Sequence, residues 1–147
     1  MEPPRQNIFN SIAEQLTDPN QNLSVILDRF IKFAVNLVNT VGELQEEIID
    51  KNFVIQMNIT DVGFNFWLRV DNGKVIYTKG VSEEATIKAD LTRDQVIRMI
   101  KGELKATDAF MKGNLKASGS LGHGLLFIRI FRLIIKYLNE NTKKKTK

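Results

Sequence analysis

The chain has 147 residues, of which 43% are hydrophobic and 26% charged, and it contains no cysteine. This length suits one compact domain with its own core, and the lack of cysteine excludes disulfides and thiolate metal sites. The formal net charge is +4, but with the four lysines of residues 143–147 set aside, 17 basic residues balance 17 acidic ones. Because a nucleic-acid-binding domain spreads basic residues over a folded face, we expect no nucleic-acid partner.

The N-terminal residues 1–20 are predicted to be a flexible lead-in. Residues 1–10 include two prolines and several polar residues instead of a basic segment followed by an apolar run, so we expect no signal peptide. The most apolar stretch, residues 121–138, is interrupted by three basic residues and does not predict a membrane span. These features favour a cytoplasmic location.

An apolar stripe predicts a long helix from about Leu23 to Asp50. Its members recur at alternating steps of four and three residues, which is the spacing of one helix face. They are Leu23, Leu27, Phe30, Ala34, Leu37, Val41, Leu44 and Ile48. Further apolar residues widen the stripe, so the helix must be covered on more than one side. It packs on its own sheet, on a second subunit, or on both, and a homodimer through residues 23–50 is one of these expectations.

Residues 53–90 change to the period of two that is typical of β-strands. Four strands are predicted, at about 53–60, 64–70, 74–79 and 85–90. Asn72-Gly73 is a strong hairpin signal because both residues tolerate a positive φ. We predict an antiparallel meander whose apolar face is covered by helices, which makes a two-layer α+β domain.

The second half is predicted to combine short helices with a fifth strand. Thr92 and Gln95 have the spacing of a capping box and open a helix that ends at Gly102. Residues 107–112 are predicted to form one short helical turn, and residues 115–118 a strand. Glycines at 119, 122 and 124 are expected to loosen the chain before a last helix over 125–138. Residues 139–147 are predicted to be a disordered basic tail, so that the domain spans 21–138.

The sequence offers little for catalysis. Its one histidine, His123, lies in a glycine-rich segment without a nucleophile elbow or a cysteine beside it. No segment has the order of a phosphate-binding loop or the spacing of metal ligands. We therefore expect a protein that is not an enzyme and needs neither cofactor nor metal.

The last predicted helix is amphipathic. Arg129, Arg132 and Lys136 share one sector of the helical wheel, opposite the apolar residues of the same helix. One interpretation is an ordinary core helix. The other is a helix that closes an apolar cavity with one face, while its basic face and Lys143, Lys144 and Lys145 contact anionic lipid headgroups.

Several of these segments together resemble the sterol carrier protein type two family. The strands Phe66-Trp67-Leu68-Arg69-Val70-Asp71-Asn72-Gly73-Lys74-Val75 and Ala85-Thr86-Ile87-Lys88-Ala89-Asp90 are similar to strands of that domain. The more specific likeness runs through Gly102-Glu103-Leu104, Ala109-Phe110-Met111, Gly113-Asn114-Leu115-Lys116 and Gly119. It covers about residues 23–138 and is strongest over 64–120.

This resemblance implies a five-stranded, mainly antiparallel sheet covered on one face by helices, with an apolar tunnel between the layers. It also implies loose binding of fatty acids, acyl-CoA, sterols or phospholipids. Strand alternation predicts three lining residues: Phe66, Leu68 and Ile87. The resemblance suggests the others: Met99, Ile100, Phe110, Met111, Leu115, Phe127, Phe131 and Ile134.

The sequence also departs from the family. Its first helix is longer and more apolar than usual, and it lacks a peroxisomal ending, which favours a cytoplasmic carrier of apolar ligands over peroxisomal sterol transfer. The alternative function is an interaction or dimerisation module that serves a lipid-metabolic enzyme and binds no ligand of its own.

Overall fold

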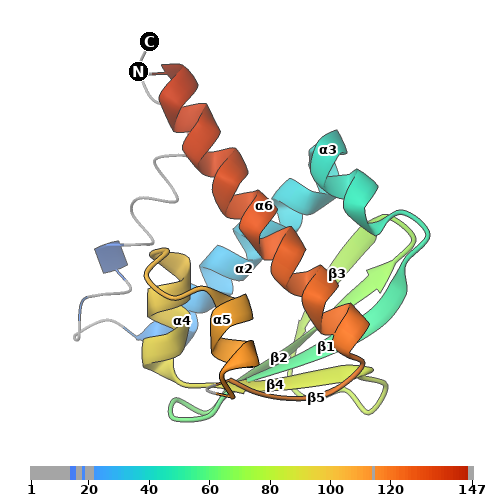
Figure 1. The fold of residues 1–147 in the computed structure, drawn as a ribbon, viewed down its shortest axis with the longest axis vertical. Coiled ribbons are helices and arrows are strands. Elements are labelled where there is room, and N and C mark those ends of the chain that lie inside the picture. Colours follow the sequence, from blue (N-terminus) through green and yellow to red (C-terminus); the bar gives the residue numbers. More distant parts are fainter. Residues whose placement is uncertain (1–13, 16–17, 19–21, 114, 146–147) are drawn as a thin grey trace.

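The computed structural model describes residues 14–15, 18, 22–113 and 115–145, with side chains as far as Tyr137. Five strands form one sheet, and the helices lie together over one of its faces (Figure 1). This architecture confirms the predicted α+β fold. The expected lead-in over residues 1–20 falls almost entirely outside the described residues.

The first long helix is shorter than predicted. α2 spans Leu23–Thr40, and the Asn22 side chain caps it by accepting hydrogen bonds from the backbone N–H groups of Ser24 and Val25. The backbone becomes extended at Val41 (φ −94°, ψ 114°), after which the chain forms α3 (Gly42–Gln45) and the 3₁₀ helix η1 (Glu46–Ile48). One continuous helix over 23–50 is therefore wrong. The apolar spacing persists across the break because Leu44 and Ile48 stay buried in the same core.

The sheet has the strand order β3-β2-β1-β4-β5. β1 (Asn52–Ile59), β2 (Phe64–Asp71) and β3 (Lys74–Lys79) pair antiparallel, and Asn72 and Gly73 form the predicted turn at φ of 43° and 90°. β4 (Ile87–Leu91) pairs in parallel with β1 and antiparallel with β5 (Lys116–Gly119). The predicted simple meander is therefore wrong at β4, which lies on the far side of β1 from β2.

A buried glutamine holds the loop that makes this crossing. Because side chains alternate along β1, Gln56 points away from the helices, and it is only 1% exposed. Its Nε2 donates to the Gly80 carbonyl at 3.0 Å, and its Oε1 accepts from the Ser82 N–H at 2.8 Å. The hydrogen-bonded Gln56 amide thus fixes the 80–86 loop, which connects β3 to β4, against the outer face of the sheet. Connections between parallel strands usually contain a helix, but here a loop is sufficient.

The remaining helices follow the predicted order with changed bounds. α4 (Arg93–Ile100) begins with the predicted capping box between Thr92 and Gln95, and α5 (Ala106–Met111) is the predicted short turn. α6 spans Leu121–Lys145, so it includes residues 139–145, for which we predicted a disordered tail. Gly124 lies within α6 and not in a loose joint. A Cβ there would come within 2.6 Å of Ile87 Cδ1, so glycine allows α6 to approach β4 closely.

Candidate functional site

An apolar cavity of about 150 Å³ lies between the inner face of the sheet and the helices. Its walls come from α2, the strands β1 to β4, α4 and α6, together with Ala106 at the start of α5. Every lining residue is aliphatic, aromatic or a methionine. Because a polar group loses free energy when it is buried without a partner, this cavity favours hydrocarbon over polar molecules.

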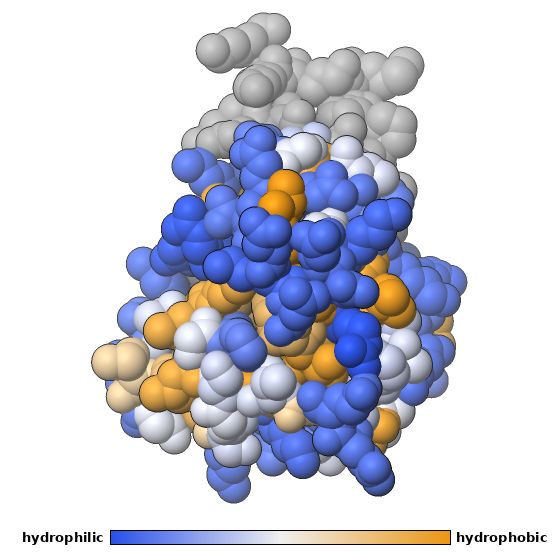
Figure 2. Space-filling model, turned by 90° about the vertical axis from the view of Figure 1, so that its right-hand side faces the viewer, coloured by the Kyte–Doolittle hydropathy of each residue, from blue (hydrophilic) through white to orange (hydrophobic). Residues whose placement is uncertain are grey.

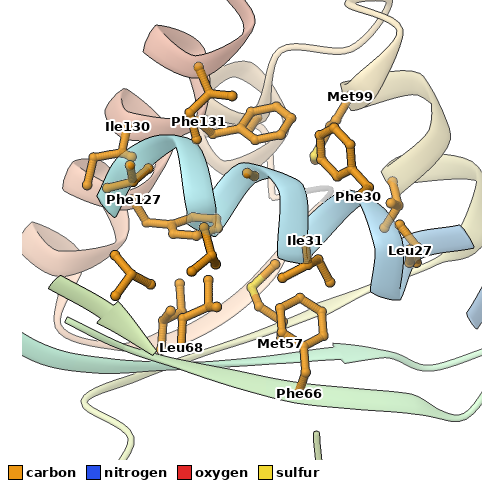
Figure 3. Close-up of a pocket in the computed structure, with 18 of the residues that line it drawn as sticks. Leu27, Phe30, Ile31, Met57, Phe66, Leu68, Met99, Phe127, Ile130 and Phe131 are labelled. Atoms are coloured by element: carbon orange, nitrogen blue, oxygen red, sulfur yellow. The ribbon is translucent and has the colours of Figure 1, made fainter. Parts of the chain in front are cut away.

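Alternation and helical periodicity place the lining side chains. Phe53, Ile55, Met57 and Ile59 follow each other at every second position of β1 and face the helices. Figure 3 shows Ile31 of α2 facing Met57 of β1 and Phe66 of β2, while Phe30 of the same helix points toward Met99 of α4. α6 supplies the other labelled side chains on the helical side.

A second apolar cavity, of about 60 Å³, adjoins the first. It lies among α5, α6, β4 and β5, and its own lining residues include Phe110, Leu115, Ala117, Leu121, Gly124 and Leu125. Six residues line both cavities: Ile55, Met57, Leu91, Met99, Ala106 and Phe127. The structure has two separate cavities between the sheet and the helices, so the continuous tunnel implied by the resemblance stays a prediction.

The structure brings most of the predicted lining residues to these cavities. Seven line the first cavity: Phe66, Leu68, Met99, Ile100, Phe127, Phe131 and Ile134. Ile87, Phe110 and Leu115 line the second. Met111 lines neither and is 75% exposed, because it follows Phe110 by about 100° on α5. Whether these side chains contact a ligand stays a prediction.

Sequence reasoning missed the contribution of α2. Leu27, Phe30, Ile31, Ala34, Val35 and Val38 all line the first cavity. The signal was present in the apolar stripe, but a stripe does not say whether it faces the chain's own sheet or a second subunit. The whole inward row of β1 was missed as well, although its alternation had been recognised.

Polar contacts fasten α2 to the edge strand β3 beside the first cavity. Asn39 accepts from the Val75 N–H at 2.8 Å and donates to the Val75 carbonyl at 2.9 Å. The Tyr77 hydroxyl donates to Asp28 at 2.7 Å, and Lys32 and Lys79 lie 3.0 and 3.6 Å from the same carboxylate.

The pKa values of the Tyr77–Asp28 pair move in opposite directions. Burial acts to raise the pKa of Asp28, but the hydrogen bonds from Tyr77 and Lys32 and the positive charges of Lys32 and Lys79 hold it below its usual value. Burial and the neighbouring carboxylate raise the pKa of Tyr77. The pair therefore combines an ionised acid with a neutral phenol at neutral pH.

The basic residues of α6 occupy different environments. Arg129 forms an ion pair with Glu47 of η1, Nε to Oε1 2.8 Å, which raises the pKa of Arg129. Arg132 and Lys136 have exposed side chains. Lys143, Lys144 and Lys145 lie in the last turns of α6, and their side chains fall outside the described part of the structure.

The side chain of His123 contacts Phe53 and Thr86. Its ring stacks on Phe53 with 4.6 Å between ring centroids, and its Nδ1 lies 2.8 Å from the Thr86 hydroxyl. Within the described residues, no group of three or more histidine, cysteine or acidic side chains is arranged to hold a metal ion. Among the same residues, no helix has the length and hydropathy needed to span a membrane.

The apolar stripe of α2, which motivated the predicted homodimer, has a partner within its own chain. Seven α2 residues are buried in the single chain, including Leu27, Phe30 and Leu37. On the side of the molecule drawn in Figure 2, hydrophobic residues appear as separate groups among hydrophilic ones. A homodimer through residues 23–50 stays an untested prediction.

Solved structures share this fold at low sequence identity. Sterol carrier protein 2 from Yarrowia lipolytica is 21% identical, with a TM-score of 0.56, over 78% of this chain and 94% of that one. Palmitated SCP2L2 from Aedes aegypti is 18% identical, with a TM-score of 0.56, over 69% of this chain and 89% of that one.

A larger protein contains the same fold. The sec-alkylsulfatase Pisa1 from Pseudomonas sp. is 18% identical, with a TM-score of 0.51, over 60% of this chain, which spans only 14% of the sulfatase. No curated protein sequence matches this chain.

Residues 36–132 match the SCP-2 sterol transfer family, and this segment includes the whole sheet, α4, α5 and the first half of α6. The match agrees with the fold relatives and with an apolar cavity between sheet and helices. The chain therefore belongs to the SCP-2 sterol transfer family.

Proposed function

We propose that this protein binds a fatty acid, or the acyl chain of a larger lipid, in the first cavity and carries it without changing it chemically. The observation that supports this most directly is the cavity of about 150 Å³ whose lining contains no polar side chain. The Aedes aegypti relative with this fold is palmitated, which agrees with the same ligand class.

The size of the cavity sets the binding energy that it can supply. An apolar cavity of about 150 Å³ accommodates a molecule of the size of benzene, or roughly six carbons. At about 0.8 kcal/mol per buried methylene, six carbons contribute about 5 kcal/mol before the entropic costs of association. The polar end of the ligand then remains outside the cavity, since no lining side chain is available to hydrogen-bond it.

Filling the cavity tests this proposal. Ala34 lines the first cavity from α2, so Ala34→Leu places three additional carbons in the space that the ligand needs. We expect octanoate and palmitate each to bind roughly 15- to 60-fold more weakly, because two to three methylenes lose their site at about fourfold each. Displacement of a fluorescent fatty acid measures this change.

Ala85→Leu is the matched control. Ala85 lies in the 80–86 loop and lines neither cavity, so its replacement leaves affinity unchanged. Thermal unfolding of both variants checks that they fold. Native mass spectrometry of the purified protein, with extraction of any bound lipid, identifies the natural ligand class. Equal affinities of all three proteins would mean that the acid binds outside the first cavity, and no measurable binding by any would favour the interaction module that binds no ligand.

We further propose that lipid exchange involves transient contact with an anionic membrane through the basic residues of α6. Arg132 and Lys136 are exposed, and three lysines end the helix. Each basic residue near an anionic surface contributes about 1 kcal/mol, which supports weak and reversible attachment.

A further inference from the structure

The second cavity adjoins the first and shares six lining residues with it. Its volume is about 60 Å³ and, like the first, its lining is entirely apolar. The six residues that line both cavities form the partition between them.

Two members of this partition are suited to movement. Met99 of α4 is half-buried and unbranched, and methionine changes rotamer at low cost in an apolar environment. Phe127 of α6 is also half-buried, and it extends from the helix toward the labelled side chains of α2 and the sheet (Figure 3). Gly124 lies one helical turn before it and lets α6 approach Ile87 of β4 closely.

The far end of the second cavity reaches the surface. Leu121 and Leu125 line it and are nevertheless 57% and 48% exposed. Apolar side chains of α5, α6 and β5 line the cavity at this end, whereas hydrogen bonds from Asn39 and Tyr77 join α2 to β3 at the opposite edge of the sheet. A long ligand therefore meets less resistance toward α5 than toward β3.

We propose that the second cavity is the binding site for the distal part of a linear acyl chain, and that Phe127, with Met99, is the partition that sets chain-length preference. This inference rests on the proposed function. A chain longer than roughly six carbons exceeds the first cavity. Displacement of Phe127 joins the cavities of about 150 and 60 Å³ into one elongated space, which takes two to three further methylenes of a flexible chain.

The test compares octanoate with palmitate in the full-length protein. Ala117 lines only the second cavity, from β5, so Ala117→Leu fills that space and leaves the first unchanged. We expect Ala117→Leu to bind octanoate like the unmodified protein and palmitate roughly 15- to 60-fold more weakly, because two to three methylenes are excluded at about fourfold each. Phe127→Leu reduces the partition, and we expect it to raise the ratio of palmitate to octanoate affinity severalfold.

The outcomes separate this proposal from the proposed function. If Ala34→Leu weakens both acids while Ala117→Leu weakens neither, or weakens both equally, the second cavity is not part of the site and the first still is. If Ala34→Leu changes neither affinity, the proposed acyl-binding site in the first cavity itself fails. Ala85→Leu again serves as the control, and thermal unfolding verifies each variant. Should Ala117→Leu not fold, the ratio of palmitate to octanoate affinity in Phe127→Leu decides: an unchanged ratio overturns the proposal.

Discussion

The hydrogen bond between Tyr77 and Asp28 shows how a polar pair can close one side of an apolar site. The pair joins β3 to α2 next to Phe66, whose ring meets the Tyr77 ring edge-on at 5.6 Å between centroids. We expect Tyr77→Phe to lower the free energy of unfolding by about 1.5–3 kcal/mol at pH 7, the usual range for a hydrogen bond to a charged group. Urea denaturation measures this loss.

The pH dependence of the loss of unfolding free energy in Tyr77→Phe identifies the cause of that loss. Because the folded-state pKa of Asp28 is held below its usual value near 3.8, its ionised form stabilises the fold above that pH. This contribution is lost as the pH falls through the lowered pKa. The difference between Tyr77→Phe and the unmodified protein should therefore shrink below pH 3.8, and a difference that stays constant would show that the hydroxyl acts through packing alone.

At the scale of elements, the basic end of α6 lies apart from the cavities. Lys143, Lys144 and Lys145 end the helix, whereas the residues of α6 that line the cavities lie between Leu121 and Ile134. We expect replacement of these three lysines by glutamate to abolish sedimentation with vesicles that contain phosphatidylserine, since three basic residues contribute about 3 kcal/mol. Fatty-acid affinity in solution should not change.

Two controls belong to this experiment. Glutamate at Lys51, Lys74 and Lys88, which are exposed elsewhere, makes the same change in net charge. Binding of the unmodified protein should also weaken as salt rises, because the Debye length shortens. Equal loss in both triple variants would point to net charge and not to α6.

Local sequence signals predicted each element but not every connection between elements. The Asn72-Gly73 turn and the capping box at Thr92 are decided within four residues, and both were predicted correctly. The parallel placement of β4 involves contacts between distant residues: Gln56 of β1 hydrogen-bonds to Gly80, 24 residues away, in the loop that leads to β4. The break at Val41 was missed because the buried positions of α2 and α3 keep one spacing through it.

For the whole molecule, family resemblance and strand alternation together predicted ten residues that line a cavity, but not the face of α2. Phe66 and Leu68 follow from alternation alone, since a strand has only two faces. Ile31 and Ala34 do not, because a helix that is apolar around much of its circumference has several faces to bury. Only the tertiary structure shows which of those faces meets the sheet.

The distribution of buried residues also predicts which part of the molecule opens. α4 and α5 bury one residue each, Ile100 and Ala109, whereas α2 buries seven. Since few buried contacts mean a low free energy of local opening, amide hydrogens in residues 93–111 should exchange at least tenfold faster than those in β1.

Ligand binding should reduce the difference in amide hydrogen exchange between residues 93–111 and β1. A hydrocarbon in the first cavity contacts Met99 and Ala106 within that segment, so saturating palmitate should slow exchange in residues 93–111 more than in β1. Ala34→Leu at the same palmitate concentration should show less slowing. Equal slowing throughout the chain would mean that ligand release requires global unfolding. If residues 93–111 were as well protected from exchange as β1 in the absence of ligand, α4 and α5 would be excluded as the part that opens. The expected pattern instead means that the sheet and α2 stay rigid, while α4 and α5, which bury the fewest residues, open to admit and release the ligand.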